Sequence, residues 1–224
     1  SDGVALQSLA IEKKEALRAD HFLIVDGGFP SPQSPCVSIG ARGIVTLKIT
    51  LQEGDKDMHS GVFGGVAYNV NRALATMLAS LHNQDHSVAV AGFYDDVCLP
   101  ESVDPSDTEE AQFNFCPTLY APAKTIQEAS TLYPTLEING IHGGYTGPGF
   151  KTVIPFQSTA YLSCRLVPCQ NPKAIAKSII AHLQHHVPPT LQFSYEIFDG
   201  TPGWRSSPHL PLVTALQETQ THPT

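Results

Sequence analysis

The stretch GIVTLKITLQ, residues 43–52, decides the fold because its side chains alternate in polarity along the whole run. The apolar set is Val45, Leu47, Ile49 and Leu51, and the polar set between them is Thr46, Lys48, Thr50 and Gln52. Successive side chains of a β-strand point to opposite faces, so this pattern is typical of a strand with one buried and one polar face. It predicts a half-buried antiparallel strand.

Five further elements follow this strand along the chain. Apolar residues recur with helical spacing over 70–81 and again over 175–183, and Asn69 and Asn171 precede the two helices as possible caps. Strands are expected at 135–141, 158–167 and 191–197. The order strand, helix, strand, strand, helix, strand predicts an α+β fold of the ferredoxin-like βαββαβ type. In this sandwich, two helices cover one face of a four-stranded antiparallel sheet.

The N-terminal part of the chain differs in character from this pattern. Residues 4–18 favour a helix, and HFLIVD at 21–26 is an apolar run without alternation, typical of a strand buried on both faces. A stretch rich in Gly, Pro and Ser then follows as a linker. We expect three parts, of which the first and last lie outside the sandwich: 1–40, then 41–203 with an irregular insertion at about 85–134, then 204–224.

Composition and charge exclude several classes of partner. The 224 residues carry 13 Lys and Arg against 21 Asp and Glu, a net charge of −8. Without a basic stripe, we expect neither nucleic acid nor an anionic membrane surface as a partner. No apolar run approaches the ~20 residues that span a membrane. The five cysteines are scattered and form no CxxC pair, which favours reduced, mostly buried thiols in an intracellular, cytoplasmic protein.

Three motifs look catalytic but have simpler explanations. The pair Glu109–Glu110 resembles a paired-carboxylate site, yet it lies in the polar stretch SDTEEAQ, where a solvated helix start is more ordinary. His182, His185 and His186 have a spacing that a metal can use, but they fall in the last turn of the second helix, where histidine complements the helix dipole. The glycine run at 143–149 lacks the Lys and Ser or Thr of a phosphate loop.

Three other residues fit a functional role better, although each has a structural alternative. Asp26 ends an apolar run and precedes two glycines, which is where open α/β sheets hold ligands; a turn or helix cap is the alternative. His59 lies in the glycine-rich stretch DMHSGVFGG, where an imidazole is accessible. Arg165 lies on the polar side of its strand, either as a surface charge or as a contact for a carboxylate or oxyanion.

Four strings, in this order and spacing, resemble one family. They are LIVDGG at 23–28, ARGIVTLKITLQEGDKDMHSGVFGG at 41–65, NGIHGGYTGPGFKTVIP at 139–155 and LSCRLVP at 162–168. Together they are similar to the two-metal metallopeptidases of the carnosinase, aminoacylase and carboxypeptidase-G type, and most of all to the cytosolic dipeptidases. The resemblance extends from Ser1 to about Gly203.

The resemblance implies a role for four residues. Asp26 matches an aspartate that binds one metal of the pair. His59 matches a lid histidine that reaches across family dimers and helps to polarise the scissile carbonyl. Thr152 matches a lid threonine that contacts substrate, also across the dimer. Arg165 matches the arginine that binds the substrate carboxylate. The resemblance further implies a homodimer formed through the lid, two divalent metal ions, expected to be zinc, and a small peptide or N-acyl amino acid as substrate.

Other parts of the family pattern are missing from this sequence. It contains no His-x-Asp, and its only Glu-Glu, at 109–110, lies away from the family's catalytic pair. We therefore expect the lid, or dimerisation, domain of such an enzyme, with residues 1–40 and 204–224 as pieces of the catalytic domain. The whole enzyme is expected to hydrolyse a peptide or amide bond with metal-activated water. This chain alone is expected to be inactive and to retain no metal.

Two alternatives stay open at this point. The first is an enzyme of the same family that removes the acyl group from N-acyl amino acids, because that reaction needs the same polarised carbonyl and activated water. The second is a non-catalytic module that self-associates or holds a peptide terminus. Sequence on either side would discriminate: a Glu-Glu just upstream, a His-x-Asp further upstream and a late His favour the enzyme.

Overall fold

A computed structural model describes residues 3–24, 37–100, 117–198 and 200–221. The chain divides into two compact units: Gly40–Ser206 forms one, and Ser1–Ile39 together with Ser207–Thr224 forms the other. The larger unit contains the four-stranded sheet.

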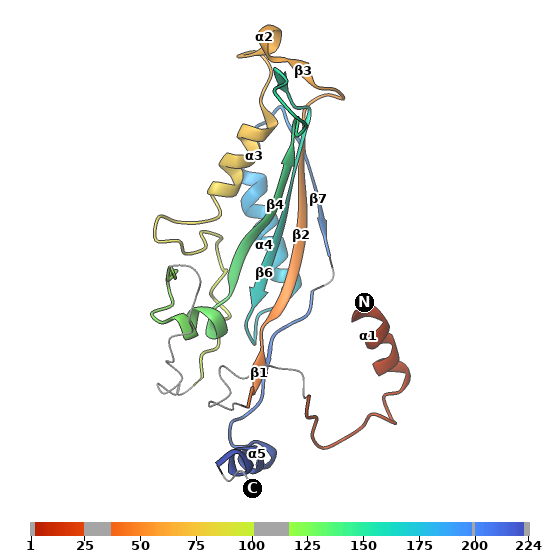
Figure 1. Ribbon diagram of the computed structural model, residues 1–224, viewed down its shortest axis with the longest axis vertical. Coiled ribbons are helices and arrows are strands. Elements are labelled where there is room, and N and C mark those ends of the chain that lie inside the picture. The colour runs from red at the N-terminus through yellow and green to blue at the C-terminus, as the bar shows by residue number, and fades with distance from the viewer. Residues whose placement is uncertain (1–2, 25–36, 101–116, 199, 222–224) are drawn as a thin grey trace. The chain divides into compact units, whose positions relative to one another are not determined.

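The sheet has the strand order β4-β6-β2-β7, and every neighbouring pair is antiparallel. Its strands are β2 (Gly43–Gln52), β4 (Thr135–Gly143), β6 (Gln157–Leu166) and β7 (Gln192–Ile197). The long helices are α3 (Val70–Ala79) and α4 (Pro172–His185). Leaving aside the shortest elements, the order along the chain is β2-α3-β4-β6-α4-β7 (Figure 1). The expected α+β fold with an antiparallel sheet is confirmed, and the elements follow in the expected βαββαβ order.

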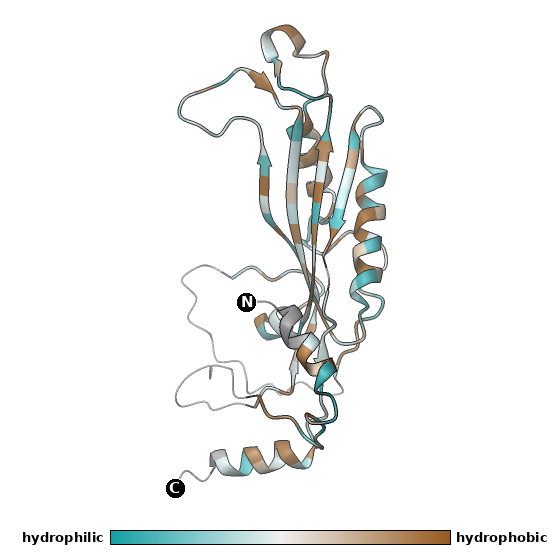
Figure 2. Ribbon diagram, turned by 90° about the vertical axis from the view of Figure 1, so that its right-hand side faces the viewer, coloured by the Kyte–Doolittle hydropathy of each residue, from teal (hydrophilic) through white to brown (hydrophobic). Residues whose placement is uncertain are grey.

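Both helices pack against the same face of the sheet. The β2 and β6 side chains on that face are buried in one core with α3 and α4, and they are Val45, Leu47, Ile49, Leu51, Ala160, Leu162, Cys164 and Leu166. The side chains between them, such as Lys48 and Tyr161, stay half-buried or exposed. This alternation appears as bands of brown and teal along the strands in Figure 2. Within the described part of the larger unit, α3 and α4 therefore leave the other face of the sheet open.

An asparagine begins each long helix. Asn69 Oδ1 accepts hydrogen bonds from the backbone N–H groups of Asn71 and Arg72, at 3.0 and 3.2 Å. Asn171 Oδ1 does the same for Lys173 and Ala174, at 2.9 and 3.2 Å. The first N–H groups of a helix have no partner within it, so each cap contributes about 1 kcal/mol. Both expected caps are present.

The described parts of the predicted insertion, 85–100 and 117–134, belong in part to the core. Val88, Val90 and Phe93 are buried with the helices and strands, and Phe93 is only 1% exposed. The Tyr94 hydroxyl accepts a hydrogen bond from the Val88 N–H at 2.9 Å. A short π-helix, η2 (Glu128–Leu132), follows before β4. The described residues of the segment contain little regular structure, and their apolar side chains complete the core.

The smaller unit differs from the sequence-based expectation. Its described residues form α1 (Gly3–Glu12), shorter than the expected 4–18, and α5 (Pro211–Thr221). Residues 21–24 form no strand, and Phe22 and Ile24 are 70% and 73% exposed, so the strand expected there is wrong for these residues. A buried parallel strand needs neighbouring strands on both sides, and the described residues of this unit contain none. The described part of the chain has no helix long and apolar enough to cross a membrane.

The buried face of β2 should dominate the stability of the larger unit. Leu47 is 1% exposed, and Leu47→Ala should lower the free energy of unfolding by about 2–5 kcal/mol, because it removes buried methyl groups and leaves a cavity. Leu99→Ala is the matched control, since Leu99 is 50% exposed and should lose far less. Urea unfolding followed by circular dichroism measures both. Equal losses in the two variants would contradict this account of the core.

Candidate functional site

His59 and Thr152 are held together at one end of the sheet by a short two-stranded ribbon. Strands β3 (Met58–His59) and β5 (Val153–Ile154) pair with His59 opposite Val153. The Ser60 N–H donates to the Thr152 carbonyl at 2.8 Å. The side chains also meet: Thr152 Oγ1 lies 3.5 Å from His59 Nε2. The structure thus places these two predicted site residues side by side, 93 positions apart in the sequence.

The His59 ring is oriented by the one-turn helix that follows it. His59 caps α2 (Ser60–Phe63), and its Nδ1 accepts a hydrogen bond from the Gly61 N–H at 3.0 Å. In a neutral imidazole only one nitrogen carries the proton, so accepting at Nδ1 assigns the proton to Nε2. A side chain at residue 61 would meet the ring, since a Cβ built on Gly61 lies 2.8 Å from His59 Cε1. His59 therefore presents an exposed N–H donor beside the Thr152 hydroxyl.

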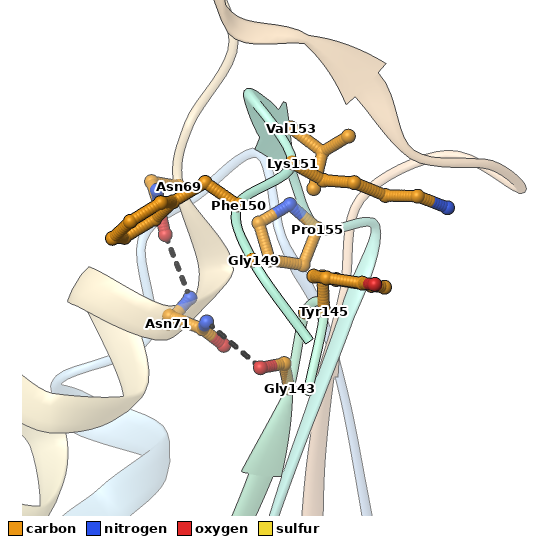
Figure 3. Close-up of a pocket in the computed structure, with 10 residues that line it drawn as sticks. Asn69, Asn71, Gly143, Tyr145, Gly149, Phe150, Lys151, Val153 and Pro155 are labelled. Carbon is orange, nitrogen blue, oxygen red and sulfur yellow. Dashed lines mark hydrogen bonds between the residues drawn. The ribbon is translucent and has the colours of Figure 1, made fainter. Parts of the chain in front are cut away.

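The glycine loop that carries Thr152 is pinned to the start of α3. Asn71 Nδ2 donates to the Gly143 carbonyl at 3.2 Å, and a Cβ on Gly143 would clash with the Asn71 side chain, so a larger residue there would disturb this bond. The two residues help to line a hollow of about 200 Å³, together with Tyr145 and Lys151. Figure 3 shows the hydrogen bond among these lining residues. The Lys151 ammonium lies 4.9 Å from the centre of the Tyr145 ring. Asn71 could not be identified from the sequence, because no local pattern indicates a hydrogen-bond partner 72 positions away.

Arg165 lies at the other end of the open face, near a second arginine. It is an exposed residue of β6, opposite Ile44 on one side and Thr135 on the other. Burial and the neighbouring Arg165 charge lower the pKa of Arg42, and Glu137 opposes this effect. An anion bound here would relieve the repulsion between the two guanidinium groups. In the sequence, Arg42 only precedes a predicted strand, so its proximity to Arg165 could not be predicted.

The two groups of predicted site residues are far apart within one chain. The ribbon holding His59 and Thr152 continues the β2–β6 ladder, since the Glu53 N–H donates to the Phe156 carbonyl at 2.7 Å. From Gln157 to Arg165, β6 extends by about 26 Å, at about 3.3 Å per residue. Figure 1 shows β3 and α2 beyond the end of the sheet at which β6 begins. A dipeptide is only about 7 Å long, so it cannot touch both groups of one chain.

Asp26 and the Glu109–Glu110 pair lie outside the described residues. Among the residues that are described, no group of three or more His, Cys, Asp or Glu side chains could hold a metal ion. A catalytic metal in this class of site needs about three protein ligands. The described residues therefore do not fit a metal centre by themselves.

The three histidines of α4 form a helix end instead of a ligand set. The rings of His182 and His186 stack with their centres 4.7 Å apart, and Ser80 Oγ lies 3.0 Å from His182 Nε2. His186 Nδ1 lies 2.8 Å from the His182 carbonyl, where it closes the last turn. Burial, with His186 as the next cause, lowers the pKa of His182.

The described fold is an antiparallel sheet with two helices on one face, with His59 and Thr152 near one end and Arg165 near the other. The family model described as a peptidase dimerisation domain, M20_dimer, matches residues 39–191. The chain belongs to this family of M20 peptidase dimerisation domains.

Two curated relatives are dipeptidases. The human Beta-Ala-His dipeptidase is 31% identical over 193 residues, which cover 81% of this chain and 38% of that protein. The Cys-Gly metallodipeptidase dug1 of Schizosaccharomyces pombe is 28% identical over 193 residues, covering 82% of this chain and 40% of the relative. The chain thus spans about two fifths of these relatives.

Two solved structures share the fold over nearly the whole chain. An M20 family metallo-carboxypeptidase, Sso-CP2 from Sulfolobus solfataricus, has a TM-score of 0.78 and 27% identity, and 96% of this chain covers 50% of that one. Human carnosine dipeptidase 1 has a TM-score of 0.75 and 27% identity, and the match covers 98% of this chain and 49% of that one.

The lowered pKa of His182 makes a pH-dependence testable. A histidine whose pKa lies below its ordinary value of about 6.5 in the folded state binds fewer protons there than in the unfolded chain. Stability should therefore fall as the pH drops below about 6.5. His182→Gln should flatten this decline in urea unfolding between pH 7 and pH 5, whereas Gln184→Ala, on the same turn, should leave it unchanged. An equal slope in all three proteins would disprove this origin.

Proposed function

We propose that this chain is the lid of a dipeptidase-like, metal-dependent hydrolase that works as a homodimer in the cytoplasm. The observation that carries the proposal is the contact of His59 with Thr152 at one end of the open sheet, with Arg165 at the other. The names of the relatives, Beta-Ala-His dipeptidase and Cys-Gly metallodipeptidase, favour a short peptide over an N-acyl amino acid as substrate.

In this proposal His59 acts as a hydrogen-bond donor to the scissile carbonyl. Its Nδ1 accepts from the Gly61 N–H, so Nε2–H is the donor, and it would exchange the Thr152 hydroxyl for a substrate oxygen. Thr152, 3.5 Å away, supplies a hydroxyl that can hold the same part of the substrate. A donor aimed at the position where negative charge develops lowers the barrier to hydrolysis. The caps and pairings around the two residues fix this donor before substrate arrives.

Arg165 takes the substrate's carboxylate in the same proposal. A guanidinium can hold a carboxylate with two parallel hydrogen bonds, which selects a free C-terminus over an amide. The nearby Arg42 adds positive charge, and Glu137 limits it. Arg165 is exposed on the open face, so its guanidinium is accessible.

The length of the sheet supports the proposal that the two groups serve different active sites. His59 and Thr152 of one subunit would complete the site in which the other subunit's own Arg165 holds the carboxylate. This arrangement gives the dimer a catalytic purpose, since a single subunit could not polarise the carbonyl and hold the carboxylate of one dipeptide. It also explains why the lid is a dimerisation domain.

The remainder of the site is proposed to lie in a catalytic domain to which residues 1–40 and 204–224 belong, with 41–203 as the lid. We propose two divalent ions, zinc by preference, with Asp26 as the one ligand from this chain; such ions supply an activated water. This proposal rests on the names of the relatives, which include metallodipeptidases.

A mixing experiment on the full-length protein tests the shared site. His59→Ala and Arg165→Ala should each be nearly inactive as homodimers. When the two variants are unfolded together and refolded, mixed dimers contain one site with both residues intact. Random pairing should restore about a quarter of wild-type hydrolysis of β-Ala-His or Cys-Gly.

The matched control mixes His59→Ala with Thr152→Ala. Both residues lie on the same end of one lid, so every site in the mixed dimer lacks one of them, and activity should not return. Recovery with Arg165→Ala and none with Thr152→Ala supports sharing between subunits. No recovery in either mixture would contradict it, and hydrolysis of N-acetyl amino acids in place of dipeptides would overturn the substrate class.

Metal retention tests the division between lid and catalytic domain. The purified 224-residue chain should hold well under one zinc per chain after dialysis and should not cleave dipeptides, because Asp26 alone cannot hold a metal. The full-length protein, treated in the same way, is the control and should retain its metal. One or more ions per short chain by elemental analysis, or metal-dependent cleavage, would show that the ligands lie within it.

A further inference from the structure

Two exposed cysteines far apart in the sequence meet in the larger unit. Cys98 and Cys169 are both exposed, whereas Cys164 is buried, so two of the three cysteines that the structure describes depart from the expected burial. Cys169 is the neighbouring group that raises the pKa of Cys98 most. The backbone also brings the two cysteines to the same short segment, because a Cβ on Gly203 would lie 3.0 Å from the nitrogen of the residue before Cys169, and Arg205, two residues on, binds the Cys98 carbonyl.

The backbone on each side of this thiol pair is held in place. The Cys98 carbonyl accepts a hydrogen bond from Arg205 Nη2 at 2.8 Å, in strand β8 (Trp204–Arg205). Gln170, next to Cys169, is 2% exposed, and its Nε2 donates to the Phe93 carbonyl at 2.8 Å. The two anchors connect the segment around Cys98 to the turn that contains Cys169, so the sulfur atoms do not meet by chance motion of free loops.

The turn at Cys169 is itself unusual. Its φ is 79°, in the left-handed region that residues other than glycine rarely adopt. The Gln170 side chain closes the turn, because its Oε1 accepts from the Val167 N–H at 3.1 Å. A strained conformation that the surrounding contacts hold in place is often associated with function. Here it presents the Cys169 thiol to solvent and to Cys98.

Cys164 serves as an internal contrast. Burial raises its pKa to about 12, with Glu137 adding to the effect, so its thiol is not ionised near neutral pH. Only a thiolate attacks a disulfide, and access is also required. Oxidation should therefore select the exposed pair and spare Cys164.

We propose that Cys98 and Cys169 form a reversible intramolecular disulfide when the protein meets an oxidised low-molecular-weight disulfide such as glutathione disulfide. One of the two thiols loses its proton and attacks a sulfur of the oxidant, whose S–S bond breaks and releases one glutathione thiolate. The second protein thiolate attacks the protein sulfur of this mixed disulfide, forms the Cys98–Cys169 bond and releases the second glutathione. The two protein thiols are oxidised, and glutathione disulfide is reduced to two thiols.

The bond would tie three parts of the larger unit at one corner. Cys98 belongs to the segment that follows the buried Phe93, Cys169 to the turn between β6 and α4, and Arg205 to β8, which pairs with β1 (Gly40–Ala41). Strands β1 and β8 are also where the chain enters and leaves this unit. The oxidised protein would hold the Cys98 segment on the sandwich by a covalent bond, in addition to the hydrogen bonds that hold it in the reduced protein.

Peptide mapping of the 224-residue chain tests the disulfide directly. The chain is equilibrated with glutathione disulfide, alkylated and digested with trypsin, which yields Cys169 in peptide 166–173 and Cys98 with Cys116 in peptide 73–124. We expect these two peptides to be joined in the oxidised protein and separated by dithiothreitol. The protein should stay monomeric in mobility on a non-reducing gel, because the bond lies within one chain.

Single substitutions assign the bond. Cys116→Ser, the matched control on the same peptide, should keep the joined peptides, and Cys98→Ser should lose them. Cys98 is exposed, so its replacement should not unfold the chain. The peptide map of the wild-type chain also tests the disulfide without any substitution. Unjoined peptides after oxidation, a joined pair that persists in Cys98→Ser, or dimers linked by disulfides would each overturn the proposal. None of these measurements depends on peptidase activity, so they fail or succeed separately from the proposed function.

Discussion

The pairing of β2 with β6 is the constraint on which the rest of this structure depends. It extends over both strands without a break in register, from Gly43 opposite Leu166 to Gln52 opposite Gln157. Because side chains alternate along a strand, a slip of one residue would move the apolar set from the helix side to the open side. The same register places Arg165 on the open face. Through the Glu53–Phe156 hydrogen bond, the ladder continues into the ribbon that holds His59 against Thr152.

A sheet that carries contact groups at both ends suits an enzyme shared between two subunits. The groups are separated by about 26 Å of strand, several times the length of a dipeptide. The well-packed sheet keeps the two groups apart, so in the proposed function a second copy of the chain would bring them together. In this account, dimerisation is part of the chemistry, and the buried core of the lid fixes where its donors lie with respect to the partner's site.

Most of the fold could be predicted from local patterns in the sequence. Alternation along 43–52 and the two asparagine caps involve residues close in sequence, so β2, α3 and α4 could be predicted from them. The strand expected at 21–26 failed over residues 21–24, because such a strand depends on neighbours that the local sequence does not describe. Contacts between distant segments were missed for the same reason. Asn71 reaches Gly143, Arg42 lies near Arg165, and Cys98 meets Cys169, and no local spacing marks any of these pairs.

The most direct test of the central claim is a crystal structure of the full-length dimer with a non-hydrolysable dipeptide analogue bound. The account predicts that the analogue's carboxylate contacts Arg165 of one subunit, and that its carbonyl, about 7 Å away at most, faces His59 of the partner subunit. Each subunit's own His59 would lie beyond the reach of its Arg165. An analogue held by His59 and Arg165 of the same subunit would contradict the account.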